Sequence, residues 1–173
     1  MSSANVKVCD IQDDVKEALR KFRFRKHNNN SALILKVDRE KQEICVDEEL
    51  ESVQLEELQD ILPSHQPRFI VYSYKMEHAD GRVSFPMCFI FYTPRDSQME
   101  LQIMYAGTKL ALQREAGLTR GLEAREIEDL TEDWLKEHIR NRLEHRINLI
   151  NPPSLWHILS QGWSISLKTV FER

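Results

Sequence analysis

The sequence predicts one α/β domain in which a central mixed sheet of five strands is sandwiched by helices. Helical and strand-like hydrophobic patterns alternate along the chain in the order α-ββ-α-ββ-α-β-α. Strand candidates that follow one another as hairpins, with helices between them, favour a mixed sheet covered on both faces. The length of 173 residues, with 41% hydrophobic and 30% charged residues, suits a single globular domain.

The first half of the chain predicts a helix, a hairpin and a short second helix. Apolar residues recur at helical spacing over residues 10–22, behind Asp10 as the N-cap. Residues 32–38 and 43–46 are β-favouring runs joined by a charged turn, which predicts a hairpin. Residues 55–62 then predict a brief helix that ends before a proline.

The second half predicts the central strands. Residues 68–78 and 82–94 are rich in aromatic and β-branched residues, and they flank an Asp80-Gly81 pair that suits a tight turn. Alternating polarity over residues 120–127 predicts a fifth strand.

Two further helices begin with capping-box spacing. One runs from Ser97, with Glu100 three residues later, to just before Gly117. The last helix is expected over residues 128–143, where Asp129 and Glu132 have the same spacing.

The helix that begins at Ser97 carries apolar residues on two nearly opposite sides. The two stripes are displaced by two residues, or about 200° at 3.6 residues per turn. The first stripe comprises Met99, Ile103, Ala106 and Leu110, and the second comprises Leu101, Tyr105, Thr108 and Leu112. One side can cover the sheet, and the other is either buried inside the molecule or open to a partner.

The three cysteines, Cys9, Cys45 and Cys88, are an odd number spread far apart, which predicts reduced thiols in a reducing compartment. The amino terminus has no apolar region typical of a signal peptide, and no stretch is long and apolar enough to span a bilayer. We therefore expect a cytoplasmic protein with no transmembrane segment.

The sequence carries no pattern typical of a catalytic or cofactor site. None of its five glycines forms a nucleotide-binding loop, and the histidines and cysteines lack zinc-ligand spacing. No serine or cysteine lies in a nucleophile motif. We expect no catalytic residue, no metal, no cofactor and no enzymatic activity.

The segment "LRKFRFRK", residues 19–26, concentrates positive charge in a chain whose net charge is −4. We call its cations Arg20, Lys21, Arg23, Arg25 and Lys26 the basic segment. Phe22 and Phe24 are expected to anchor it to the core. Three roles for these cations are compatible with the sequence: a solvated face, a contact with an acidic protein partner, or a site for nucleic acid or anionic lipid. The acidic overall balance argues against nucleic acid.

Residues 68–94, "RFIVYSYKMEHADGRVSFPMCFIFYTP", followed by "IMYAGTK", resemble the actin-depolymerising factor homology (ADF-homology, cofilin-like) family. The segments "LRKFRFRK", "DEELE", "DGRVS", "CFIF", "MYAG" and "EDLTE-WL" occur in compatible order, so the resemblance covers roughly residues 6–143. We expect one ADF-homology domain at 1–146. The 147–173 extension, with three charged residues in 27, has no counterpart and either docks on the domain or packs little.

The resemblance implies a non-enzymatic regulator that binds the actin-related protein 2/3 complex, inhibits branched nucleation and promotes debranching. Actin subunits at the branch junction are a second implied partner, and the chain is expected to be a monomer at the actin cortex or lamellipodia. The alternative is a phosphoinositide- or actin-binding module that severs filaments.

Members of the family insert their long helix into a partner's cleft, and they touch a neighbouring filament subunit through a projecting hairpin and the end of the last helix. The resemblance therefore implies two partner surfaces. The first comprises Arg20, Lys21, Arg23, Arg25, Ile103, Met104, Gly107, Lys109, Glu128 and Asp129. The second comprises Lys75, Arg82, Lys136 and Arg140. Cofilin-like members carry lysines just ahead of the "MIYA"-type stretch, where this chain has Glu100, Leu101 and Gln102. This departure favours an actin-related protein over actin. Ser2 and Ser3 are candidate phosphorylation sites.

Overall fold

The computed structural model describes residues 9–140. The chain divides into two compact units, 1–134 and 135–173, and the sheets, α1, α2 and α3 all lie in the first. In chain order the elements are β1 (Asp10–Ile11), α1 (Asp13–Phe24), β2 (Ser31–Asp38), β3 (Glu43–Glu51), α2 (Leu58–Ile61), β4 (Arg68–Ser73), β5 (Met76–Glu77), β6 (Val83–Ser84), β7 (Met87–Tyr92), α3 (Met99–Glu115), β8 (Gly121–Ala124) and a 3-10 turn (Ile127–Asp129), followed by helical residues 132–140.

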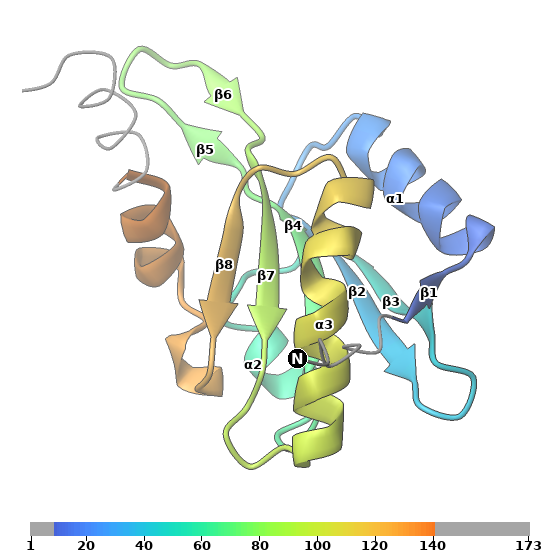
Figure 1. Cartoon of the computed structure of the whole chain (residues 1–173). Coiled ribbons are helices and arrows are strands. Elements are labelled where there is room, and N and C mark those ends of the chain that lie inside the picture. The colour runs from blue at the N-terminus through green and yellow to red at the C-terminus, as the bar shows by residue number, and fades with distance from the viewer. Residues whose placement is uncertain (1–8, 141–173) are drawn as a thin grey trace, which may run out of the picture. The chain divides into compact units, whose positions relative to one another are not determined.

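The main sheet is mixed, as expected, and its order is β1-β3-β2-β4-β7-β8 (Figure 1). Neighbours are antiparallel except at the two edges, where β1 runs parallel to β3 and β8 runs parallel to β7. The sheet has six strands rather than the expected five because Asp10 and Ile11 pair with Glu43 and Ile44. Asp10 is therefore a strand residue and not the N-cap of α1, a position held by Gln12.

Both expected hairpins are present. β2 pairs with β3 from Ser31↔Glu51 to Asp38↔Glu43, and Gln42 closes the turn with a positive φ of 57°. The second hairpin is interrupted: β4 pairs with β7 in the main sheet, while β5 and β6 form a small sheet of their own. Gly81, at φ 83°, lies in the turn between β5 and β6, where a left-handed conformation favours glycine.

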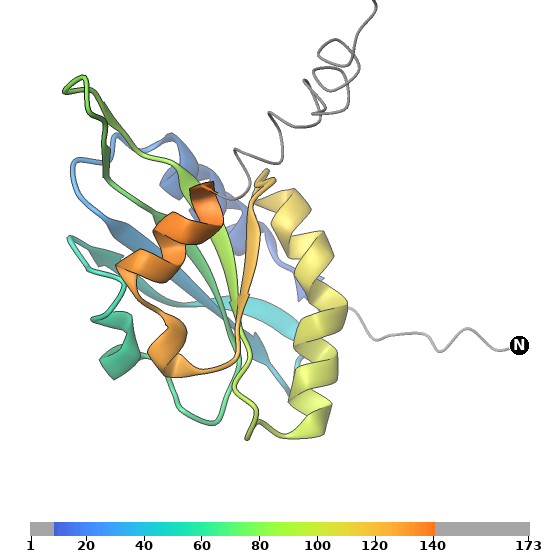
Figure 2. The same cartoon turned by 90° about the vertical axis from the view of Figure 1, so that its left-hand side faces the viewer.

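Helices cover both faces of the sheet (Figure 2). α1 and α3 share one core with one face of the central strands, in which Leu33, Phe69 and Phe89 are completely buried. α2 lies on the opposite face, toward which the alternate strand residues Ile34 and Ile70 point. This alternation explains why β4 is buried along its whole length.

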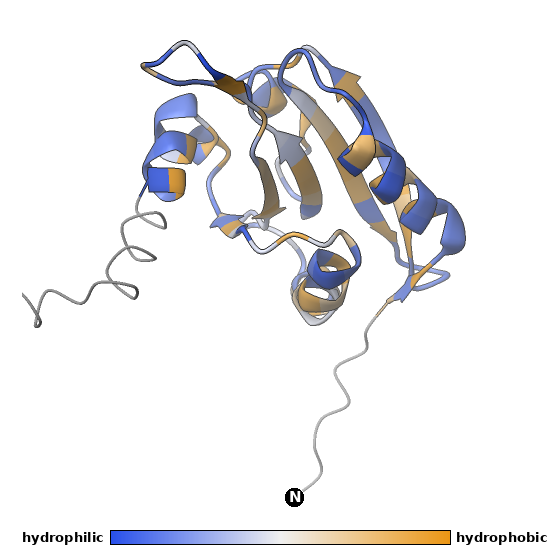
Figure 3. Cartoon of the chain, turned by 90° about the horizontal axis from the view of Figure 1, so that it is seen from above, coloured by the Kyte–Doolittle hydropathy of each residue, from blue (hydrophilic) through white to orange (hydrophobic). Residues whose placement is uncertain are grey.

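α1 and α3 differ in how apolar residues are distributed around them. α1 is strongly amphipathic: Val15, Leu19 and Phe22 are buried, and the outer side is polar. In Figure 3, α1 is blue over most of its visible surface, whereas α3 shows both colours around its turns. The sheet therefore covers only part of the apolar surface that α3 carries.

The helix caps differ from those expected. α3 begins at Met99 after Gln98, with no side-chain cap, because the Ser97 hydroxyl donates to the Pro94 carbonyl. Asp129 and Glu132 also form no capping box. Asp129 ends the 3-10 turn, and the Thr131 Oγ1 atom instead accepts a hydrogen bond from the Trp134 N–H. Capping-box spacing alone did not decide which residue capped either helix.

The remaining sequence predictions concern the end of the chain and the cysteines. β8 is shorter than the strand expected at 120–127, because the chain turns into the 3-10 segment. The last three residues of the expected final helix, the domain boundary at 146 and the 147–173 extension lie outside the described residues. Cys9, Cys45 and Cys88 form no disulfide, as the sequence predicts.

Candidate functional site

One side of α3 is apolar and exposed. Met99 is 69% exposed, Ile103 53% and Leu110 54%, and Ala106 lies exposed between them. We call these four residues the α3 stripe. The other side packs on the sheet, with Tyr105, Thr108 and Leu112 buried and Leu101 half-buried. Of the two alternatives left open by the sequence, residues 9–140 show the open one, because they do not bury this side of the helix.

Met104 does not belong to this exposed surface, although the sequence reasoning placed it there beside Ile103. Its side chain is only 5% exposed and lies in the core that α1 and α3 share with the sheet. Each residue advances about 100° around a helix, so Met104 falls on the side of Leu101 and Thr108, three and four residues away. The prediction that Met104 faces water and a partner is therefore wrong, because the side chain is buried in the folded domain.

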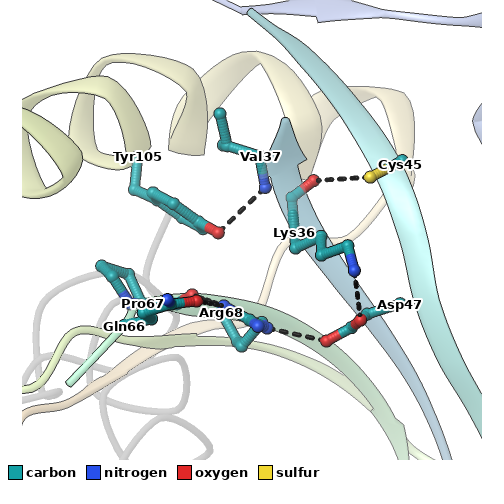
Figure 4. A network of polar contacts seen from close by, with 8 residues as sticks. All are labelled: Lys36, Val37, Cys45, Asp47, Gln66, Pro67, Arg68 and Tyr105. Atoms are coloured by element: carbon teal, nitrogen blue, oxygen red, sulfur yellow. Dashed lines mark hydrogen bonds and ion pairs between the residues drawn. The ribbon is translucent and has the colours of Figure 1, made fainter. Parts of the chain in front are cut away.

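Hydrogen bonds from two α3 side chains fix the helix on the sheet. Thr108 Oγ1 accepts the Cys9 N–H at 3.0 Å and donates to the Met104 carbonyl at 2.8 Å. The Tyr105 hydroxyl accepts the Val37 N–H at 2.9 Å (Figure 4), and burial raises the pKa of this phenol. These two contacts hold the buried side of α3 and leave the α3 stripe facing outward. Sequence reasoning missed both anchors; a threonine within an otherwise apolar stripe is their only local signal.

A network of charged residues supports the strands beneath α3 (Figure 4). Arg68, only 8% exposed, donates from Nε to Asp47 Oδ2 at 2.8 Å, and Lys36 Nζ lies 2.8 Å from Asp47 Oδ1. Burial alone would raise the pKa of Asp47, but the hydrogen bonds from Lys36 and Arg68 outweigh it and hold this pKa below its usual value. The hydrogen bond to Asp47 also raises the pKa of Lys36. Asp47 thereby joins β2, β3 and β4.

Cross-links to other segments surround the first turn of α3. Arg39, from the β2–β3 turn, donates to Gln98 Oε1 at 3.2 Å and pairs with the Glu100 carboxylate. Arg95, just before α3, pairs with Glu126 at 2.6 Å. The latter contact brings the 3-10 segment that carries Glu128 and Asp129, both exposed, toward the start of α3.

Gly107 and Lys109 lie beside the α3 stripe and are half-buried. The Lys109 ammonium is 5.4 Å from the centroid of the Phe91 ring and 3.4 Å from Glu123 Oε2. Lys109 is therefore held toward β8 within the free chain. A partner would have to compete with Glu123 for it.

The basic segment splits into residues that are held and residues that are free. Arg25 pairs with Glu49 at 2.7 Å and Glu51 at 2.6 Å, and Lys21 pairs with Glu17 at 2.8 Å. The Arg23 guanidinium lies against Gly117, where the Cβ atom of any other residue would overlap its Nη1 atom. Within residues 9–140, the side chains of Arg20 and Lys26 form no hydrogen bond or ion pair.

Phe22 and Phe24 have opposite environments. Phe22 is 1% exposed and anchors α1 in the core, as expected. Phe24 is 77% exposed, so the expectation that it also points inward is wrong. Two residues along a helix differ by about 200°, so both cannot face the core. Arg23 lies over the Phe24 ring, 5.7 Å from its centroid.

The structure brings the basic segment to the carboxyl end of α3. A hollow of about 120 Å³ is lined from α1 by Arg20, Arg23 and Phe24, and from α3 by Glu115 and Ala116. Sequence reasoning had assigned both elements to one surface without a reason for their proximity. The shared core supplies that reason, because α1 and α3 pack on the same face of the sheet; Gly117, at φ 64°, ends the helix and leaves room for Arg23.

The residues of the expected second surface fall in separate parts of the chain. Lys75 and Arg82 lie at the β5–β6 hairpin and pair locally, with Glu77 and Asp80 respectively. Lys136 and Arg140 are exposed on the helical residues 132–140, beyond Trp134 and thus in the second unit.

Residues 9–140 hold no group of three or more His, Cys, Asp and Glu side chains placed to bind a metal ion. In the same part of the chain, no helix has both the length and the apolar character needed to cross a membrane.

Comparison with known proteins identifies the family. Residues 8–140 match the model of the family described as cofilin/tropomyosin-type actin-binding protein. The chain belongs to this ADF-homology family. Glia maturation factor of Drosophila melanogaster is 62% identical over 133 residues, which cover 77% of this chain and 96% of that protein. Human glia maturation factor beta is 54% identical over 137 residues, covering 79% and 96%.

A solved structure shares both fold and sequence. The solution structure of glia maturation factor from Caenorhabditis elegans superposes with a TM-score of 0.67 at 41% identity, covering 79% of this chain and 98% of that one. A cofilin from Streptomyces griseoflavus, at 20% identity and TM-score 0.65, shares the fold. Within the ADF-homology family the chain thus groups with the glia maturation factors, and this membership supports an actin-regulatory role.

Proposed function

We propose that this chain binds the actin-related protein 2/3 complex, inhibits branched nucleation and promotes debranching without acting as an enzyme. The α3 stripe carries the proposal. Three large aliphatic side chains stand more than half exposed on one side of a helix that is anchored rigidly by its other side. Such a helix suits insertion into an apolar groove of a partner.

The residues around the α3 stripe support an actin-related protein over actin as its partner. Cofilin-like members are expected to carry lysines at the start of this helix, where Glu100 of this chain is paired with Arg39. Arg20, whose side chain forms no ion pair within residues 9–140, lies by the other end of α3. Acidic surface on a partner would therefore meet the carboxyl end of α3 more favourably than its first turn.

Several finer features belong to the same proposal. The ADF-homology domain would extend to residue 146, with 147–173 as an extension. Lys75, Arg82, Lys136 and Arg140 would contact actin subunits at the branch junction. Family membership implies a cytoplasmic, actin-associated location, and the proposed partner would place a monomeric chain at the cortex or lamellipodia.

The test is a pull-down of the purified complex with Ile103→Asp, the central residue of the α3 stripe. Because Ile103 is exposed, the variant should fold like the wild type while its complex binding is lost. Ile61→Asp is a matched control, since Ile61 is 40% exposed but lies on α2, on the opposite face of the sheet. Complex binding by a folded Ile103→Asp variant would refute the proposed surface.

Met104→Asp is the second control in that experiment. A lone carboxylate buried among Phe69, Tyr105 and Leu112 costs several kcal/mol, a large part of the ~5–15 kcal/mol that stabilises a domain. We expect this variant to lose its cooperative thermal transition, which Ile103→Asp should keep. Retention of the transition by Met104→Asp would show that the side chain can leave the core.

Direct binding to actin is the alternative, which the family description favours. Parallel pull-downs with monomeric and filamentous actin separate the two. Retention on actin but not on the purified complex would replace the proposed function with the alternative. Loss of binding to both by Ile103→Asp would still assign the α3 stripe as the shared surface.

A further inference from the structure

Ser52 lies in the turn after β3, at the rim of a small polar hollow. Its backbone has a positive φ of 56°, uncommon for a residue with a side chain, and the residue is exposed. The hollow measures about 130 Å³ and lies between the end of α1 and this turn. Its lining residues are Arg25, Lys26, His27, Asn28, Asn29, Ser31, Glu51 and Ser52.

One hydrogen-bond donor reaches the Ser52 hydroxyl, and two cations line the same hollow. Asn29 Nδ2 already donates to Ser52 Oγ at 3.0 Å. Lys26 lines the same hollow, and its ammonium forms no ion pair within residues 9–140. Arg25 also lines it, with its guanidinium on Glu49 and Glu51. The hollow thus holds an exposed hydroxyl, an amide donor on it, and the two cations Lys26 and Arg25, which are groups that can bind a phosphorylated side chain.

We propose that Ser52 is a phosphorylation site whose phosphate is held by Lys26, Arg25 and Asn29. In the modification, Ser52 Oγ forms a bond to the γ-phosphorus of a nucleoside triphosphate. The bond from that phosphorus to the β–γ bridging oxygen breaks, and a nucleoside diphosphate leaves. The hydroxyl proton passes to the general base of the protein kinase that catalyses the transfer.

The phosphate would redirect Arg25. Glu51 and Glu49 oppose a new negative charge in this region, but each carries a single charge. A phosphoserine carries about −1.5 to −2 near neutral pH and has three acceptor oxygens, so it competes with Glu51 for the Arg25 guanidinium. The exchange would draw Arg25 and Lys26, two of the five cations of the basic segment, into an internal contact. This modification does not depend on which partner the basic segment meets.

The electrostatic half of the proposal can be measured by phosphorus NMR. Phosphoserine is incorporated at position 52 of the full chain, and its second pKa, near 6 for an unperturbed group, is followed by titration. Nearby cations should lower this pKa by about one unit, the low end of the effect of an opposite charge within ~4–6 Å. Lys26→Gln and Arg25→Gln should each raise this pKa part of the way back to its unperturbed value. Phosphoserine at Ser64, an exposed turn residue outside this hollow, is the matched control.

Mass spectrometry of the chain isolated from its own cells, with phosphatases inhibited, tests whether the site is used. Residues 42–68 form one tryptic peptide that contains both Ser52 and Ser64, so a single fragment reports on the site and its control. Phosphate on Ser52 is expected. An unmodified Ser52 would overturn the proposal. It would also be overturned if phosphoserine had the same second pKa at positions 52 and 64 and if Lys26→Gln left the pKa at position 52 unchanged.

Discussion

One or two residues along a helix separate a core side chain from an exposed one in this protein. Ile103 and Met104 are neighbours on α3, yet one is 53% exposed and the other 5%. Phe22 and Phe24 on α1 differ in the same way, at 1% and 77%. The cause is the 100° advance per residue, which makes the face of a helix a property of each position.

Phe22 and Phe24 should therefore differ in their contribution to stability. Phe22→Ala leaves a cavity between α1 and the sheet, and we expect a loss of about 3–5 kcal/mol in the free energy of unfolding. Phe24→Ala removes an exposed ring and should change it by less than about 0.5 kcal/mol. Urea unfolding of the two variants measures both values. Equal losses would mean that Phe24 packs inward in solution.

At the scale of elements, α3 and the central strands depend on polar contacts made across long sequence separations. Tyr105 reaches Val37 on β2, Thr108 reaches Cys9 beside β1, and Asp47 joins β2, β3 and β4 through Lys36 and Arg68. A buried group left without its partner costs about 1–3 kcal/mol. These contacts therefore set where α3 lies as well as how stable the domain is.

The Asp47 network predicts a pH dependence of stability. The pKa of Asp47 is lower in the folded chain than in the unfolded chain. Its contribution is thus present above the unfolded pKa of about 3.9 and is lost as the pH falls through the lower folded value. We expect the stability difference between wild type and Asp47→Asn to be constant above about pH 5 and to shrink below about pH 3.9.

Chemical denaturation at a series of pH values measures this difference. Glu48→Gln is the control, because Glu48 is an exposed neighbour on β3 that forms no ion pair within residues 9–140. Its difference from wild type should stay small, within about 0.5 kcal/mol at neutral pH. An Asp47→Asn difference that persists unchanged to pH 2 would show that the pairing contributes nothing to folding.

At the scale of the whole molecule, association with a charged partner depends more on where the charges lie than on the net charge of −4. Five cations gather at the end of α1, but Arg23 packs on Gly117 and Arg25 holds two glutamates. Replacing either of those two would remove contacts within the chain as well as a positive charge. Arg20, which has no hydrogen bond or ion pair within residues 9–140, is the cleaner probe of steering.

Arg20→Gln should slow association with the proposed partner by a few-fold at low salt, because rim charges steer encounter more than they hold the complex. The screening length is ~8 Å at about 0.15 M ionic strength and ~3 Å at 1 M, so the effect should fade as salt rises. Stopped-flow association rates at two salt concentrations measure it. Lys41→Gln, an exposed cation on the β2–β3 turn, is the control. Equal rates for the two variants at low salt would identify Arg20 as part of a solvated face.

The prediction of the candidate site from sequence was partial. Periodicity located α3 and its two apolar stripes, and the structure shows that Ile103 faces outward. The same reasoning placed Met104 wrongly, because it lies at the border between the stripes, where a one-residue difference decides burial. The approach of the basic segment to α3 depends on the core that α1 and α3 share, in which Phe22 and Leu112 are 90 positions apart and share no local pattern.

The sequence by itself determined the element types, their order, the mixed sheet and the family, because periodicity, turn residues and motif spacing act over short stretches of chain. Tertiary structure decided the rest: the sixth strand at Asp10, the caps of the later helices, and which stripe of α3 faces solvent. The sixth strand and the buried side of α3 depend on partners distant in sequence, such as Glu43 for Asp10 and Cys9 for Thr108, whereas the caps depend on which local hydrogen bonds the folded chain forms. A local pattern carries no information about such a partner, so only the folded chain could show it.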